Sequence, residues 1–411
     1  MTRWRLAISG AALSLLLLAA AATHAVHIQI DYSYDSSGFF PLGSAARQTL
    51  ERVADFYSNL LGDTFSPIVT PPQFVSSLPP EYNPGTAWWH WTMTFNNPSG
   101  PGQISLLDQS IAANEYRIYV GAKSLSGNTL GQGGPGGLSY ESNNDGGNFT
   151  PEEGEEIDAI DDQFYAAVTQ RGEPGGFARW GGAVTFDRDL ETIWHFDRTT
   201  LPPAGANDFL SVAVHEIGHA VGLGGSQEWI NRTLGSGDNA YFNGEQASDV
   251  YGGPVPLAFN NVGGTPIADK AHWREGTMST IVGSATTQEA AMDPTLTTGT
   301  RKRFTRLDAA ALSDIGWTVV PPELSGDFNQ DNVVDAADYT SWRDGLGTLY
   351  DAGDYADWKA NFGQSPGAGA AAEILPVPES ATTNLAFAAI CLALALSPRD
   401  LPGSIPRQRL C

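Results

Sequence analysis

Over the first three quarters of the chain, some segments carry apolar residues at the two-residue spacing of a strand and others at the spacing of a helix. Residues 27–34 alternate apolar and polar side chains as a strand does, and residues 45–61 carry apolar side chains at helical spacing. Four further segments are rich in β-branched and aromatic residues and are predicted as strands: 88–95, 115–120, 183–186 and 192–196. The Gly-rich stretch 127–147 is predicted as loop. Strand and helix patterns in one stretch without a linker-like break predict a mixed α/β (α+β) domain over residues 26–320.

Both ends of the chain have the composition of targeting signals. Residues 1–25 open with two arginines, continue with an apolar stretch and end in small residues, which is typical of a secretory signal peptide. A permanent N-terminal membrane anchor is the alternative. Residues 376–411 run from a Pro-Val-Pro-Glu-Ser motif through a short apolar segment to an Arg-rich end. This order resembles the PEP-CTERM sorting signal, which implies removal by an exosortase-type processing enzyme; a short C-terminal anchor is the alternative.

Charge and cysteine content restrict the classes of partner and of stabilising cross-link. The chain of 411 residues has 46 acidic and 22 basic residues, for a formal net charge of −24. Such an excess of acid repels phosphate, so a nucleic-acid partner is not expected. Cys391 and Cys411 are the two cysteines. Both lie in the predicted tail, so the body of the protein has no disulfide framework. The acidic run 152–162 is expected to be a solvated face, with a calcium site as the alternative.

Candidate metal chemistry centres on a predicted helix over residues 208–223. His215 and His219 are four positions apart, which places both imidazoles on one face, one turn apart, where they can hold one zinc ion. Catalytic zinc takes a third protein ligand and keeps a position for water, whose pKa it lowers toward ~7. Glu216, beside the first ligand, is the expected general base that takes the proton of this water and passes it to the leaving amine.

The third ligand is expected downstream of this helix. His272 is the only histidine after His219. Carboxylates in the intervening segment are rival ligands: Asp238, Glu245, Asp249 and Asp269. Two other histidines, His90 and His195, stand in aromatic strand patterns and are expected to be packed structural residues.

The run His-Glu-Ile-Gly-His-Ala-Val-Gly-Leu over residues 215–223 resembles the metzincin clan of zinc peptidases. In that clan the third ligand follows the last Gly by three positions, where this chain has Gly225. A long insertion before the third histidine resembles the leishmanolysin-type arrangement, which implies His272 as the zinc ligand. The resemblance also implies a zincin-like fold with a mixed sheet, an active-site helix and peptidase activity.

Two further segments resemble parts of the same clan. Residues 290–294 are similar to the Met-turn, which implies that Met292 lies beneath the zinc ligands; Met278 is the rival. Residues 307–317 look like the closing helix of such peptidases. Upstream, residues 181–187 followed by Trp194 resemble the edge-strand region where substrate adds as an extra strand.

An internal repeat follows the predicted catalytic domain, over residues 326–363. Residues 335–347 match residues 351–363, and the two copies are predicted to form a pair of helices, hence a small all-α module. Oxygen ligands before the first helix have calcium-loop spacing: Asp327, Asn329, Asp331, the carbonyl of Val333, Asp335 and Asp338. This loop resembles a dockerin repeat, which implies bound Ca²⁺ and a cohesin-like or other surface partner. An acidic turn without calcium is the alternative. Residues 364–375 are predicted as a linker.

These features together predict an exported zinc metallopeptidase. It would be an endopeptidase, secreted or held at the cell surface, that hydrolyses peptide bonds in a protein or peptide substrate. A surface binding or scaffold protein with a catalytically silent zincin fold is the alternative. The presence of Glu216 favours the enzyme, because a silent fold has no need of the base.

Overall fold

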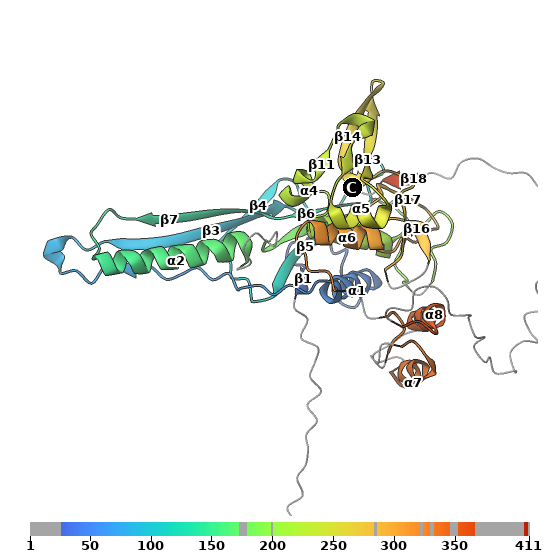
Figure 1. The fold of residues 1–411 in the computed structure, drawn as a ribbon, viewed down its shortest axis with the longest axis horizontal. Coiled ribbons are helices and arrows are strands. Elements are labelled where there is room, and N and C mark those ends of the chain that lie inside the picture. The colour runs from blue at the N-terminus through green and yellow to red at the C-terminus, as the bar shows by residue number, and fades with distance from the viewer. Residues whose placement is uncertain are drawn as a thin grey trace, which may run out of the picture.

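The computed structural model describes residues 26–171, 179–198, 200–282, 286–320, 324–328, 333–345, 352–365 and 407–409. This part of the chain contains eight α-helices and several β-sheets, so the protein belongs to the mixed α/β class (Figure 1). The predicted signal peptide, most of the linker and the sorting tail up to residue 406 lie outside the described residues. Within the described ranges, no helix is long and apolar enough to cross a membrane.

A four-stranded mixed sheet forms the centre of the molecule, in the order β1-β5-β8-β6. Its strands are β1 (His27–Asp31), β5 (Glu115–Lys123), β8 (Gly181–Asp187) and β6 (Gly131–Pro135). The first three run parallel and β6 is antiparallel to β8. Strands were predicted at the positions of β1, β5 and β8. The prediction that residues 181–187 form the edge is wrong, because β8 is paired on both sides and β6 occupies the edge.

Two helices cover one face of this sheet and enclose the main core. They are α1 (Ala45–Leu60) and α3 (Phe209–Ala220). The apolar stripe of α1 packs on α3 and β1, and α3 packs on β6 and β8. Because α3 is covered by the sheet, by α1 and by the C-terminal part of the domain, all but one of its residues are buried. Full burial explains why the sequence of this helix is apolar all round apart from its chemical residues.

A second, antiparallel sheet forms the long arm of Figure 1 and packs against the opposite side of the central sheet. It contains β2 (Phe74–Val75), β3 (Thr86–Asn96), β4 (Gln103–Leu107) and β7 (Gly137–Asn144), covered by α2 (Pro151–Gln170). The prediction that residues 127–147 form a loop is therefore wrong, since β6 and β7 lie within this range. Glycine lowers strand propensity, but hydrogen bonding to β8 and β3 overrides that local preference. Most of the acidic run 152–162 is exposed on α2, as expected.

The remaining elements follow β8 in the chain. They are β9 (Trp194–His195), β10 (Asn207–Asp208), α4 (Gln227–Asn231), β11 (Thr233–Leu234), β12 (Tyr241–Phe242), α5 (Glu245–Tyr251), β13 (Val255–Val262), β14 (Thr265–Trp273), β15 (Met278–Thr280), β16 (Thr287–Glu289), β17 (Thr295–Thr297), α6 (Arg306–Asp314), α7 (Ala336–Gly345), α8 (Ala352–Asn361) and β18 (Arg407–Arg409), which pairs with β17. The insertion after α3 ends in the β13-β14 hairpin, which projects from the body in Figure 1. Strand β14 ends at Trp273, directly after His272.

The two repeat helices α7 and α8 pair, as the internal repeat predicts. Ring centroids of Tyr339 and Trp358 lie 5.3 Å apart, and those of Trp342 and Tyr355 lie 5.0 Å apart. These four residues occupy matching positions in the two copies, so the repeat supplies the aromatic contacts that join the two helices.

The predicted calcium loop precedes α7 and is described only in part. Asp327 and Asp338 are buried, and Oδ2 of Asp338 accepts the backbone N–H of Asp335 at 2.7 Å. Val333 is 38% exposed. Asn329 and Asp331 lie outside the described residues, and calcium binding stays a prediction.

Candidate metal centre

Helix α3 is held at both ends by buried hydrogen bonds. Asp208 caps its N-terminus by accepting the backbone N–H of Ser211, and Arg301 donates to both oxygens of Asp208, at 2.9 and 2.7 Å. At the other end the hydroxyl of Tyr116 donates to the carbonyl of Ala220 at 2.8 Å, and the indole N–H of Trp317 donates to that of Val221. The helix that carries the histidine pair is therefore rigidly placed.

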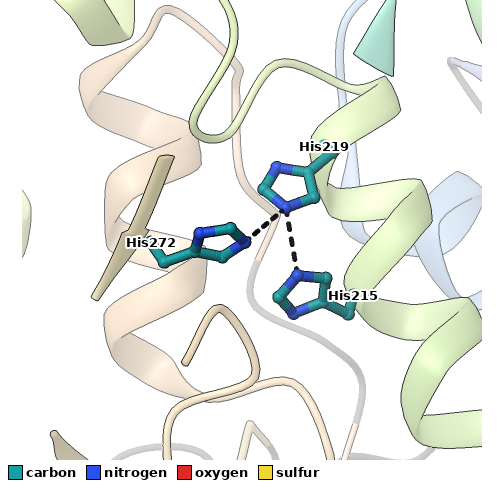
Figure 2. Close-up of side chains that lie close together, drawn as sticks. All are labelled: His215, His219 and His272. Carbon is teal, nitrogen blue, oxygen red and sulfur yellow. Dashed lines mark hydrogen bonds between the residues drawn. The ribbon is translucent and has the colours of Figure 1, made fainter. Parts of the chain in front are cut away.

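Three buried imidazoles converge at this helix, as Figure 2 shows: His215 and His219 from α3 and His272 from β14. Nε2 of His219 lies 3.0 Å from Nε2 of His215 and 3.2 Å from Nε2 of His272. Within the described ranges, this is the one group of three or more His, Cys, Asp or Glu side chains placed to hold a metal ion. The structure thus brings together all three histidines that the sequence nominated, and they can hold a metal ion.

The second nitrogen of each ring has its own acceptor. Nδ1 of His215 lies 2.7 Å from the carbonyl oxygen of Ala291, and Nδ1 of His219 lies 2.7 Å from that of Leu223. Nδ1 of His272 lies 3.0 Å from Oδ2 of Asp269. A neutral ring that donates its Nδ1–H keeps the lone pair on Nε2 for a metal, so these acceptors set the tautomer that metal binding needs.

Burial keeps the ring pair on α3 neutral. It holds the pKa of His215 well below its usual value and lowers the pKa of His219 to about 3, with the neighbouring imidazoles adding to both shifts. Neutral imidazole is the form that binds metals, so the environment favours ligands that need not lose a proton first.

Glycines allow the third ligand to approach α3. A methyl group at Gly224 would lie 2.4 Å from the carbonyl oxygen of Ala271, the residue before His272, and Gly224 has a φ of +78°. Only glycine satisfies both conditions without strain. Of the rival carboxylates, Asp269 is the hydrogen-bond partner of His272. The others, Asp238, Glu245 and Asp249, are not members of the metal-binding group found among the described residues.

Met292 lies beneath the histidine helix. It is fully buried, and a methyl group at Gly218 would lie 2.8 Å from its Sδ atom and 3.1 Å from the hydroxyl of Tyr57. That hydroxyl donates to the carbonyl of Val214 at 2.7 Å. The rival Met278 is 51% exposed on β15. Gly218, between the two ligands in sequence, therefore leaves the space that the methionine sulfur fills.

Asp308 of α6 is a buried hub that the sequence analysis missed. Its Oδ1 accepts the indole N–H of Trp273 at 2.8 Å and the N–H of Met292 at 3.2 Å. Its Oδ2 accepts the N–H of Ala291 and both the N–H and the hydroxyl of Thr305, at 2.9, 2.9 and 2.6 Å. One carboxylate thus joins the strand of His272 to the turn that hydrogen bonds His215. The spacing Thr-x-x-Asp before an apolar run, a capping signature, could have marked this residue.

Asp308→Asn is expected to destabilise the fold by about 1–3 kcal/mol, because one oxygen becomes an N–H donor that faces donors already in place. Urea unfolding of the metal-free protein measures this change in the free energy of unfolding. Asp162→Asn, on the exposed face of α2, is the matched control and should leave stability unchanged. If Asp308→Asn were as stable as wild type, the hydrogen bonds to the Asp308 carboxylate would not contribute to the stability of the fold.

Glu216 is fully buried on α3, where it faces β6. A methyl group at Gly133 would lie 2.1 Å from the backbone carbonyl oxygen of Glu216. A strand with side chains at that position could not pack so close to the helix. The Gly-rich composition that argued for a loop is what lets β6 lie directly against the residue expected to act as base.

The two histidines set aside by the sequence analysis lie elsewhere. Nδ1 of His90 lies 2.6 Å from Oδ2 of Asp108 on the arm, and Nε2 of His195 lies 3.0 Å from the carbonyl oxygen of Thr200. Neither belongs to the metal-binding group, although both are partly exposed rather than packed in a core.

Comparisons of the chain with known protein families, curated proteins and solved structures found no match.

Proposed function

We propose that the protein is an exported zinc-dependent endopeptidase of metzincin-like type with a leishmanolysin-like third ligand. The observation that carries this proposal is the convergence of three buried imidazoles on a helix that also carries the buried Glu216. Tetrahedral zinc with Zn–N bonds of about 2.0–2.1 Å places its ligand nitrogens about 3.3–3.4 Å apart. The observed separations of 3.0 and 3.2 Å are close to that range. Three nitrogen ligands from protein side chains are typical of catalytic zinc, because they leave a position for water.

Each residue of the site then has a stated role. A bound zinc ion would lower the pKa of a water molecule toward ~7 and polarise the peptide carbonyl. Glu216 accepts a proton from the attacking water and delivers it to the leaving amine. His215, His219 and His272 would hold the ion through their Nε2 atoms, and Asp269 would orient His272 by accepting the Nδ1–H of its ring. Met292 supplies the apolar floor.

The outer edge of β6, which pairs with no other strand among the described residues, is the proposed place for the scissile peptide. It is the last strand of the central sheet, and it lies against α3 at Glu216. An extended peptide can add to such an edge through main-chain hydrogen bonds. This assigns to β6 the function that the sequence resemblance had assigned to the segment of β8.

Removal of the metal is the direct test. We expect the purified full-length protein to contain about one zinc ion at the histidine site, as the one catalytic zinc requires, and to cleave casein or gelatin. Dialysis against a chelator should abolish cleavage, and added Zn²⁺ should restore it. Metal analysis and a gel-based cleavage assay measure both quantities. Cleavage that persists in the metal-free protein would rule out the zinc mechanism.

A zinc-loaded protein that cuts no member of a peptide library would favour the scaffold alternative. In that case partner capture should depend on Asp327 of the repeat module and should be unchanged in Glu216→Gln. The peptidase proposal makes the opposite prediction for Glu216.

The proposed function also includes calcium in the loop of the repeat module, and secretion or display at the cell surface through the terminal segments. The sequence patterns alone support these two parts.

A further inference from the structure

The side chain of Glu216 occupies the space that a side chain at position 131 would need. A methyl group built on Gly131 would lie 2.6 Å from both Cγ and Oε1 of Glu216 and 2.7 Å from its Cδ. Contacts below 3.0 Å are not tolerated between such atoms, so alanine at 131 requires the carboxylate to move. Both residues are buried, so the carboxylate has to move within the protein interior.

The conflict at Gly131 involves a side chain and spares the backbone. The three closest atoms are all in the side chain of Glu216, whereas at Gly133 the closest atoms belong to the helix backbone. Gly131 also has no left-handed φ, so alanine there suffers no backbone strain. Substitution at 131 should therefore displace the carboxylate and leave the histidines of α3 in place.

We propose that Gly131 is a positioning residue for Glu216, and that its missing side chain holds the carboxylate at the place where it accepts the proton of the attacking water. The catalytic part of this inference rests on the proposed function, because it takes Glu216 as the general base. A general base must stand within about 2.6–3.2 Å of the group it deprotonates. A misplacement of about 1 Å can cost on the order of 100-fold in rate.

Gly134 provides a matched control on the same strand. A methyl group at Gly134 meets nothing within 4 Å, and its φ also lies outside the left-handed region. Gly131→Ala and Gly134→Ala make the same chemical change in β6, three positions apart. They differ in whether the new methyl group meets Glu216, so any difference between the two variants reports on that contact.

The kinetic test compares these variants in the zinc-loaded full-length protein. We expect Gly131→Ala to lower kcat by about 100-fold, as a displaced base predicts, with KM and zinc content close to wild type. Gly154→Ala, on α2 and outside the proposed peptide-binding strand, should match wild type in all three, because its methyl group also meets nothing within 4 Å. Gly134→Ala measures what a methyl group on β6 does by itself, without contact to Glu216. Loss of zinc in Gly131→Ala would overturn the inference, because the effect would then pass through the ligands. A kcat equal to that of Gly134→Ala would overturn it as well.

A stability cycle tests the same contact without any use of activity. Gly131→Ala should lower the Tm of the metal-free protein, and the loss should disappear in the Glu216→Ala background, where the conflicting atoms are gone. This readout also serves if Gly131→Ala alone fails to fold, since the double variant should fold like Glu216→Ala. An equal loss of Tm in both backgrounds would show that Gly131 acts on something other than Glu216. If the wild type binds zinc and cuts nothing, the proposed function fails while this cycle still decides the contact.

Discussion

Replacing Glu216 with glutamine is expected to leave zinc bound and to lower kcat by about 100- to 10,000-fold, the range for loss of a general acid-base group. Glutamine has nearly the shape of glutamate, so it fills the same buried space beside β6. Its amide cannot take up the proton of the attacking water at neutral pH. The three imidazoles do not depend on this side chain for their Nδ1 acceptors. Chemistry should therefore be lost while the metal stays.

The measurement pairs zinc content with initial rates of peptide cleavage under saturating substrate. Glu156→Gln, on the exposed face of α2, removes the same charge far from the site and should leave kcat unchanged. Equal, measurable cleavage rates in Glu216→Gln and wild type would show that this carboxylate is not the base. Absence of cleavage in both proteins would support the scaffold alternative.

Replacing His272 with alanine is expected to remove the metal itself and all cleavage with it. His215 and His219 would remain on α3, one helical turn apart, and the third nitrogen ligand would be missing. Loss of a partner outside the ligand sphere already costs 10- to 100-fold in metal affinity. Loss of a ligand should exceed the upper end of that range. Asp269→Asn, which disturbs only the orientation of His272, should fall within it.

Competition with a chelator of known zinc affinity measures both variants on one scale. His195→Ala is the matched control, because His195 is a partly exposed histidine outside the metal-binding group. If His272→Ala kept wild-type affinity, the third ligand would have to come from a carboxylate. Asp269, at 3.0 Å from His272, would be the first to test.

Local patterns predicted the parts of the site that lie within one element. The spacing of His215 and His219 implies a shared helix face whatever surrounds the helix, because 3.6 residues per turn place positions i and i+4 together. Helical spacing of apolar side chains also predicted α1, and cap and stop residues predicted α3. Resemblance to a closing helix predicted α6, and the match between the two repeats predicted that α7 and α8 pair. His272 was identified as the only histidine downstream of His219 and by the leishmanolysin-like resemblance. Its place in the cluster, 53 positions from His219, depends on the fold of the whole insertion.

Predictions from the sequence failed where contacts between distant segments determine the structure. Glycines in residues 127–147 favour loop by propensity, yet β6 and β7 form there since their partners β8 and β3 supply the hydrogen bonds. The resemblance assigned the edge of the central sheet to the segment of β8, and this is wrong because the local sequence of one strand does not encode the order of strands in a sheet. Asp308 was overlooked because its five donors come from three separate segments of the chain.

The sequence by itself determined the chemistry available to this protein: a histidine pair at helical spacing, a carboxylate beside it, a distant third histidine and a repeat with calcium-loop spacing. Those features are local, and helix geometry or residue type suffices to recognise them. Tertiary structure alone decided that β14 meets the turn after α3 at Gly224, and that β6 passes Glu216 at Gly131. Such contacts depend on close approach of backbones distant in sequence, and the absence of a side chain, which permits that approach, has no local pattern to announce it.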